Sequence, residues 1–289
     1  MKRLAAYILL MRPKQWIKNL FVFLPVFFSL QIGNITLLRH SLIAFIAFSL
    51  VASSIYIFND IHDIEEDQKH PVKRNRPISS GKINLRSAYL FMTALLATGI
   101  LVGTTLNADV VRFLSYYLLL NFLYTLWLKK IAIIDTFIIS IGFVLRLYIG
   151  SFATGIHLSV WIILMTFLLA LFLALSKRKD DLNIFEATGK KTRKTQGYTI
   201  EFLNLSMTIM ASIIIVSYIM YSTSPTIMQK NNGDMLYITT IFVLLGIMRY
   251  MQLSLAEKTS TSPTDILYTD RVIQLSILGW IGTLFILLY

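Results

Sequence analysis

The chain has no cysteine and few charged residues. None of its 289 residues is Cys, so disulfide bonds and thiolate chemistry are excluded. Charged residues make up only 15% of the sequence, whereas soluble globular proteins have about 25%. Hydrophobic residues make up 56%, and the mean hydropathy is +0.67. This composition leaves no room for a separate soluble domain, so we predict one transmembrane catalytic domain over residues 1–289.

Apolar runs near the length of about 20 residues that crosses a bilayer recur along the whole sequence. We therefore predict an all-α polytopic membrane protein with nine transmembrane helices. These helices are expected near residues 15–32, 39–59, 86–106, 109–128, 131–153, 159–176, 200–221, 235–254 and 271–289. The first residues are basic but contain no clear cleavage site, so no removable signal peptide is predicted.

Lys and Arg are distributed unevenly between the predicted loops. With the N-terminus in the cytoplasm, 23 of them lie on the inner side and three on the outer side. The positive-inside rule therefore predicts a plasma-membrane protein whose N-terminus and candidate active site face the cytoplasm. The net charge of +12 favours anionic substrates and the lipid bilayer as partners, and we expect no nucleic acid.

One cytoplasmic stretch, residues 59–81, reads "NDIHDIEEDQKHPVKRNRPISSG". Asp60, Asp63 and Asp67 are spaced i, i+3, i+7, which places them on one face if the helix continues past Phe58. Like charges this close repel each other, so the cluster indicates a bound cation. Oxygen ligands without Cys or paired His favour Mg²⁺. We therefore predict that the three aspartates are catalytic metal ligands.

The second half of the same stretch is basic. Lys73, Arg74 and Arg76 follow the aspartates and offer the charges that bind phosphate oxygens. Mg²⁺ is usually completed by substrate phosphates, so the two halves together predict a Mg²⁺–phosphate site. The alternative is a solvated loop that only sets topology, which explains the basic residues but not three aligned aspartates.

Basic residues surround the point where the first predicted span enters the membrane. Arg12 and Lys14 are interpreted as interfacial anchors. Lys18 and Asn19 lie further into the predicted membrane span, and we take them as candidate substrate-binding residues, with anchoring at the interface as the alternative.

Ionisable residues also occur inside a predicted span. Asp135 and Arg146 lie within residues 131–153, where charge is costly and indicates a functional role by default. Arg146 is interpreted as lining the site or holding a neighbouring residue. Tyr124, on the 109–128 span, either reaches the site or packs between helices. Asp270, before the last span, is interpreted as a helix cap or part of a lid.

The pattern N-D-x-x-D-x-x-x-D, followed by "HPVKRNRPISSG", resembles the first signature of the UbiA superfamily of intramembrane prenyltransferases. The resemblance implies a nine-helix fold with a central cavity and a Mg²⁺–diphosphate site near the cytoplasmic face. The signature also makes Asn59, Lys73 and Arg76 candidate substrate-binding residues.

The superfamily's second aspartate motif, D-x-x-x-D, is absent. Asp180 and Asp181 are adjacent, and Phe185 stands four positions beyond Asp181. The loop instead resembles that of the decaprenyl-phosphate phosphoribosyltransferase branch, as do "RPKQWIKNLFVFLPVFF", "NFLYTLWLKKIAIIDTFIISIGFVLRLYIG" and "SPTDILYTDR". The residues that would match this branch as substrate-binding positions are Lys177, Arg178, Asp181, Arg193 and Tyr198.

The resemblance implies transfer of 5-phosphoribosyl from phosphoribosyl pyrophosphate to a polyprenyl phosphate. A first alternative is a prenyltransferase that joins a prenyl diphosphate to an aromatic or other small acceptor. A second alternative is a transporter or lipid-binding protein that uses the fold without chemistry. The sequence leaves open the polyprenyl chain length and the oligomeric state, with dimers and trimers as alternatives.

Overall fold

The computed structural model describes residues 2–69, 73–188, 197–229, 233–256 and 263–288. All regular secondary structure in these ranges is helical. The chain divides into two compact units: unit 1 comprises residues 1–128 and 142–158, and unit 2 comprises residues 129–141 and 159–289. The division falls inside the helix α7 (Ile134–Thr154), so its first part belongs to unit 2 and its second part to unit 1.

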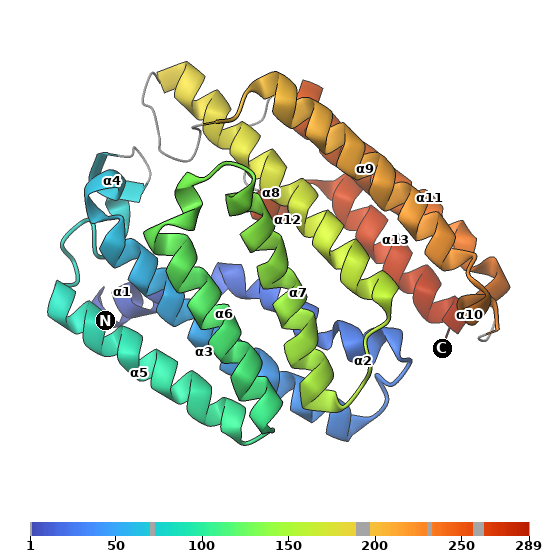
Figure 1. Ribbon diagram of the computed structural model, residues 1–289, viewed down its shortest axis with the longest axis horizontal. Coiled ribbons are helices and arrows are strands. Elements are labelled where there is room, and N and C mark those ends of the chain that lie inside the picture. The colour runs from blue at the N-terminus through green and yellow to red at the C-terminus, as the bar shows by residue number, and fades with distance from the viewer. Residues whose placement is uncertain (1, 70–72, 189–196, 230–232, 257–262, 289) are drawn as a thin grey trace. The chain divides into compact units, whose positions relative to one another are not determined.

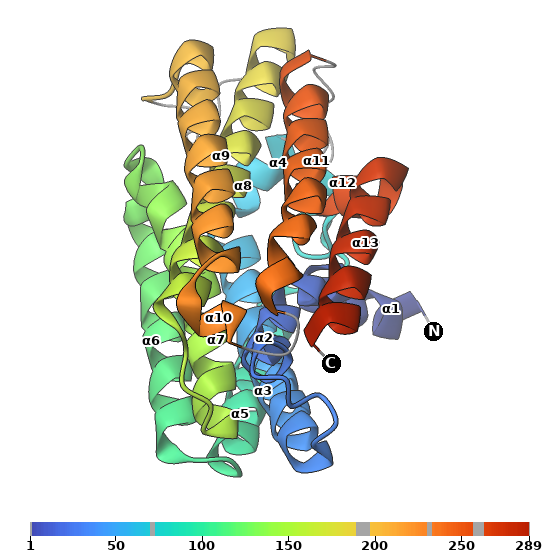
Figure 2. The same cartoon turned by 90° about the vertical axis from the view of Figure 1, so that its right-hand side faces the viewer.

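Unit 1 is built around the long helix α3, which packs along α5 and α6 (Figures 1 and 2). Buried side chains of Phe48 and Val51 on α3 form its core together with Leu114 on α6. Besides its part of α7, the unit contains α1 (Lys2–Met11), η1 (Pro13–Phe23), α2 (Leu24–Phe28), α3 (Ile35–His62), α4 (Ile64–Lys69), η2 (Lys73–Asn75), α5 (Leu85–Thr104) and α6 (Ala108–Leu126).

Unit 2 pairs α8 with α9 and α11 with α13. Its core includes Phe172 on α8 and Leu203 and Met207 on α9. Besides the start of α7, it contains η3 (Leu128–Lys130) from Lys129 onward, α8 (Val160–Thr188), α9 (Ile200–Ser222), α10 (Pro225–Met228), η5 (Gly233–Thr239), α11 (Thr240–Met251), η6 (Gln252–Ala256), α12 (Pro263–Thr269) and α13 (Arg271–Leu288).

Side-chain caps explain where the long helices of unit 1 begin. Asn34, Asn84 and Asn107 precede α3, α5 and α6, and each side-chain oxygen accepts a backbone N–H of the first turn. Such caps satisfy donors that have no partner within the helix. Polar asparagines between apolar runs therefore fix the helix starts.

The described chain contains seven helical segments that are long and apolar enough to cross a membrane. They are Ile35–His62, Leu85–Thr104, Ile134–Thr154, Val160–Ile184, Ile200–Ser222, Met235–Leu255 and Arg271–Leu288. The chain is thus an all-α integral membrane protein, but the predicted count of nine is not confirmed.

The two remaining predictions differ from the structure for separate reasons. The span expected at 15–32 is wrong as a continuous helix, because the chain there forms the 3₁₀-helix η1 and the five-residue helix α2. Pro13 and Pro25 each lie at the start of one of these elements, and proline cannot continue a helix in its interior. The span expected at 109–128 is the 19-residue helix α6, which is less apolar than the seven.

A glycine brings η1 close to α7. A Cβ atom on Gly150 would collide with the backbone carbonyl of Val22. Only glycine lets the two backbones lie this close. The contact holds Val22 of η1, three residues after Asn19, against α7.

Candidate active site

Two buried aspartates and two arginines form a cluster in unit 1, which we call the carboxylate centre: Arg12, Asp60, Asp67 and Arg76. Nη1 of Arg76 donates to Asp60 Oδ1 at 2.9 Å and to Asp67 Oδ2 at 2.6 Å. Nη2 of Arg12 forms a further ion pair with Asp60 Oδ1. The carboxylates are 2–4% exposed, whereas the arginine side chains are 26–28% exposed. The arginines therefore link the buried carboxylates to the surface.

The predicted single face of three aspartates is wrong in its geometry. Helix α3 ends at His62, Asp63 is its C-cap with φ −99° and ψ 13°, and α4 begins at Ile64. The chain thus leaves the helix between Asp60 and Asp67. Among the described residues, no group of three His, Cys, Asp or Glu side chains is placed to hold a metal ion. The structure brings Asp60 and Asp67 together, and Asp63 remains a prediction as a ligand.

The donor set of the carboxylate centre fits Mg²⁺. The carboxylates of Asp60 and Asp67 both pair with Nη1 of Arg76, so they lie close together. The atoms that they offer to a metal ion are all oxygens. Mg²⁺ is usually bound by one or two carboxylates and completed by water and substrate phosphates. Asp60 and Asp67 meet that requirement without a third protein ligand.

The position of Arg12 depends on a contact between the N-terminal segment and α3. Ser53 Oγ donates to the carbonyl of Met11 at 2.9 Å and accepts from Trp16 Nε1 at 3.1 Å. Arg12 itself has φ 52°, an uncommon conformation for a residue other than glycine. The prediction of a mere interfacial anchor missed its pairing with Asp60. Asp60 lies 48 residues further along the chain, so no local pattern in the sequence indicates this pairing.

Arg146 is enclosed by the protein. It is 4% exposed, and its guanidinium lies over the rings of Phe48, Tyr117 and Phe143 at 4.6–5.2 Å. Its Nε donates to Asn19 Oδ1 at 3.0 Å, and its Nη1 donates to the Gly142 carbonyl at 2.7 Å. These contacts agree with the interpretation that Arg146 holds a neighbouring residue.

The remaining candidates of unit 1 surround the end of α3. Asn59 Oδ1 accepts a hydrogen bond from Thr125 Oγ1 on α6, which joins the two helices. Tyr124 precedes Thr125 on α6 and is half-buried. Lys73 begins η2, which ends directly before Arg76, and Lys18 precedes Asn19 on η1.

A second polar cluster lies in unit 2, and we call it the basic centre: Asp135, Lys177, Arg178, Asp181 and Tyr198. Arg178 is 3% exposed; its Nε forms an ion pair with Asp135 Oδ2, and its Nη1 donates to Asp181 Oδ2 at 2.9 Å. Tyr198 donates to Asp135 Oδ1 at 2.5 Å. Lys177 Nζ lies 3.7 Å from Asp181 Oδ1. Four predicted substrate-binding residues are thus brought together: Arg178 and Tyr198 bind Asp135, and Asp181 joins Arg178 to Lys177.

Tyr198 is held as a hydrogen-bond donor. Its hydroxyl accepts from the backbone N–H of Ile133 at 2.7 Å while it donates to Asp135. Burial, followed by the hydrogen bond to the Asp135 carboxylate, raises the pKa of Tyr198 to about 12. The phenol therefore stays protonated at any physiological pH.

Two buried charges next to the basic centre were not predicted. Lys179 and Asp180 are each 3% exposed, and Lys179 Nζ donates to the Ser254 carbonyl at 2.9 Å. Within the described structure, Asp180 Oδ2 has no hydrogen-bond partner. All five residues of the run "KRKDD" are buried or ion-paired, so the density of charge in this run was the available signal. Arg193 and His70 lie outside the described residues.

Asp270 is a helix cap, as one of its two interpretations predicted. Its Oδ1 accepts the backbone N–H of Ile273 at 2.9 Å, and its Oδ2 accepts from Arg249 Nη2 at 2.8 Å. The bond from Arg249 is the main reason that the pKa of Asp270 lies below its usual value.

Comparison with known proteins gives the family. The UbiA prenyltransferase family matches residues 19–267. A protein of Mycolicibacterium smegmatis named decaprenyl-phosphate phosphoribosyltransferase is 32% identical over 94% of this chain and 89% of its own length. A protein of the same name from Corynebacterium glutamicum is 31% identical over 96% of this chain and 85% of its own length.

The fold agrees with solved structures. A UbiA homologue from Archaeoglobus fulgidus, bound to GPP and Mg²⁺, has a TM-score of 0.73 at 20% identity, covering 98% of this chain and 99% of the homologue. This likeness concerns the fold. The matched residues and the curated relatives confirm the resemblance found in the sequence, and the chain belongs to the UbiA prenyltransferase family.

Proposed function

We propose that this chain transfers 5-phosphoribosyl from phosphoribosyl pyrophosphate to a polyprenyl phosphate and releases pyrophosphate. The observation that carries the proposal is the basic centre. It lies where an aspartate motif would stand in an aromatic prenyltransferase, and it buries an arginine and a tyrosine instead. The names of the relatives from M. smegmatis and C. glutamicum support a polyprenyl phosphate as the acceptor and a phosphoribosyl group as the group transferred.

The carboxylate centre suits the leaving diphosphate. Asp60 and Asp67, with Asp63 as a further predicted ligand, would hold Mg²⁺, which supplies charge stabilisation for the departing pyrophosphate. Arg12 and Arg76 carry two positive charges beside the carboxylates and are partly exposed. Guanidinium groups bind phosphate oxygens in a bidentate manner, so both are proposed to contact the diphosphate.

The basic centre suits a second phosphate. The donor carries a phosphate at C5 in addition to its diphosphate, and the acceptor contributes another. Lys177 is half-buried and points a flexible ammonium toward Asp181, while Arg178 is fixed by Asp135 and Asp181. Preorganised cations stabilise developing negative charge without reorganisation during the reaction. We propose that Lys177, Arg178 and Arg193 bind substrate phosphates and that Asp181 and Tyr198 orient them.

The reaction needs no general base. A phosphate oxygen of the acceptor attacks C1 of the ribosyl group while the bond from C1 to the diphosphate oxygen breaks. The bonding electron pair leaves with pyrophosphate, and the attacking oxygen carries no proton to be removed. The described histidines are therefore not required as proton acceptors.

A second candidate function is prenyl transfer from a prenyl diphosphate to an aromatic or other small acceptor. The carboxylate centre favours it to the same extent, because that centre would bind any diphosphate. The A. fulgidus homologue that shares the fold is bound to GPP. The two functions differ in the donor, not in the metal.

The test measures binding of both donors to the purified protein in detergent. Phosphoribosyl pyrophosphate and geranyl diphosphate are titrated with and without Mg²⁺, and pyrophosphate release is followed after addition of a polyprenyl phosphate. We expect Mg²⁺-dependent binding of the sugar donor, lost at least tenfold in Asp67→Asn and retained in the matched variant Glu65→Gln, whose carboxylate is exposed on the same helix. Binding of geranyl diphosphate alone would establish the second function instead.

A further inference from the structure

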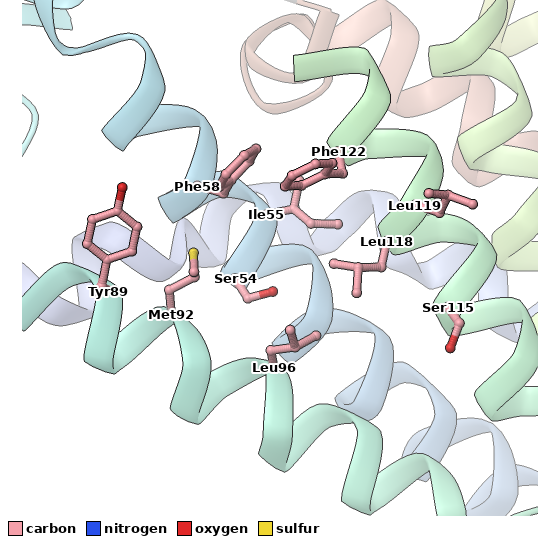
Figure 3. Close-up of a pocket in the computed structure, with 10 residues that line it drawn as sticks. All are labelled: Ser54, Ile55, Phe58, Tyr89, Met92, Leu96, Ser115, Leu118, Leu119 and Phe122. Atoms are coloured by element: carbon pink, nitrogen blue, oxygen red, sulfur yellow. The ribbon is translucent and has the colours of Figure 1, made fainter. Parts of the chain in front are cut away.

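An apolar cavity of about 370 Å³ lies between α3, α5 and α6 of unit 1 (Figure 3). This volume falls in the range of small-molecule pockets and exceeds the voids of a well-packed interior. We call it the α5–α6 groove. Six of the residues that line it are Ser54, Phe58, Tyr89, Met92, Leu96 and Phe122.

The groove opens toward the bilayer. Helices α3 and α5 are both long and apolar enough to cross the membrane, and only 17% of the most apolar stretch of α5 is buried in the protein. Leu90 on α5 and Leu119 on α6 are 72% and 56% exposed. Surfaces of this kind contact lipid hydrocarbon, so a lipid tail is the apolar molecule available to enter the groove.

Arg86 places a positive charge at one end of the groove. On α5 the lining residues Tyr89, Met92 and Leu96 follow a helical stripe, and Arg86 extends that stripe by one turn. On α3, His62 follows Phe58 by one turn, and the two rings stack at 6.2 Å. Both Arg86 and His62 are exposed. A ligand with an apolar chain and an anionic phosphate therefore matches both parts of the surface.

The groove is separate from the carboxylate centre. Phe58 and Asp60 are two residues apart on α3, which places their side chains about 200° apart around the helix. Figure 3 shows Phe58 directed toward Phe122 and the groove, and their rings stack at 4.9 Å. A lipid in the groove consequently presents its phosphate to Arg86 rather than to Asp60.

We infer that the α5–α6 groove binds one acyl chain of an anionic phospholipid, whose phosphate lies at Arg86 and His62. This is a lipid site distinct from the proposed acceptor site. It does not depend on which donor the enzyme uses.

The test counts lipids retained by the purified full-length protein in native mass spectrometry. The protein is incubated with phosphatidylglycerol or phosphatidylcholine of the same chains. Wild type is expected to retain phosphatidylglycerol preferentially. Ser115 on α6 also lines the groove. Ser115→Trp, which fills the groove, and Arg86→Gln, which removes the charge, are each expected to reduce retention about fivefold.

Matched controls separate this site from general lipid contact. Leu90→Trp adds the same ring outside the groove, and Arg39→Gln removes an exposed charge near the N-terminal end of α3, away from Arg86; neither is expected to change retention. Thermal unfolding checks that every variant is folded. Equal retention by Ser115→Trp and Leu90→Trp would overturn the inference.

Two other occupants give distinct results. Displacement of phosphatidylglycerol by an equal amount of polyprenyl phosphate would assign the groove to the acceptor. A change of oligomeric mass in Ser115→Trp would assign it to a second copy of the chain. Either result overturns the phospholipid site.

Discussion

At the scale of single residues, the carboxylate centre depends on charge compensation. Asp60 and Asp67 are almost fully buried, and Arg76 places one nitrogen between them. Removing one partner of a buried ion pair typically costs about 3–5 kcal/mol, because the other charge is left uncompensated in the protein interior. The arginines are therefore as important to the centre as the aspartates.

The substitution Arg12→Gln tests this dependence. Loss of a charged hydrogen bond to Asp60 is worth about 1.5–3 kcal/mol, which predicts a fall in kcat/KM of about 10- to 100-fold. Steady-state assays at saturating Mg²⁺ measure it. Lys14→Gln removes an exposed charge two residues away and should stay near wild type. Equal effects of both changes would mean that Arg12 acts only through net charge.

The residue types of the site were predictable from the sequence, and their pairing was not. The acidic and basic halves of residues 59–81 indicated a phosphate site, and Arg76 proved to contact two of the three aspartates. The partner of Asp135 was not predictable, because Arg178 lies 43 residues away on another helix. Asp135 and Arg146 share α7, yet they bind separate networks in different units.

At the scale of elements, helix ends decide the local structure. Hydrophobic runs predicted six of the seven apolar helices to within about four residues. The exception is α8, which continues to Thr188, so residues 177–188 of the predicted basic loop are helical. The end of α3 at His62 was missed because the charged residues after it also favour a helix. Where a helix stops depends on tertiary contacts such as the bonds from Arg76.

Asp270 joins the start of α13 to Arg249 on α11. Because its pKa is lowered in the folded protein, its contribution is present above its unfolded pKa near 4 and is lost as the pH falls through the lower folded value. Asp270→Asn keeps a good helix cap but loses the ion pair, so we expect about 1 kcal/mol less stability at pH 7.

Thermal unfolding in detergent from pH 7 to pH 3 measures this difference. The gap between wild type and Asp270→Asn should close as the pH falls below 4. Glu201→Gln, which removes an exposed carboxylate in the first turn of α9, should show no such gap. A gap that is constant with pH would mean that the cap, not the charge, is responsible.

The close approach of Val22 on η1 to Gly150 on α7 allows a direct test of how these two helices pack. Gly150→Ala would force Val22 away and is expected to destabilise the protein by about 1–3 kcal/mol. Gly282→Ala on α13 meets no atom within 4 Å and should be neutral or stabilising by about 0.5–1 kcal/mol. Thermal unfolding of both variants compares them directly. Equal stability would show that η1 moves freely relative to α7.

At the scale of the whole molecule, the distribution of charge predicts the orientation in the membrane. The 23 inner and three outer basic residues predict that residues 59–86 and 177–199 lie on the cytoplasmic side. Phosphoribosyl pyrophosphate is a charged, soluble metabolite, so the proposed reaction requires this orientation. The predicted topology therefore places these two basic segments on the same side of the membrane as the proposed donor.

The absence of cysteine makes the orientation directly measurable, because any introduced thiol is unique. Gly33 precedes α3 and Lys82 follows it, and both are exposed. In the predicted topology, Gly33→Cys and Lys82→Cys therefore place single thiols on opposite sides of the membrane. A membrane-impermeant maleimide is expected to label Gly33→Cys in intact cells and Lys82→Cys only after permeabilisation. Labelling of Lys82→Cys in intact cells would reverse the topology and would place the carboxylate centre on the side that lacks the proposed donor.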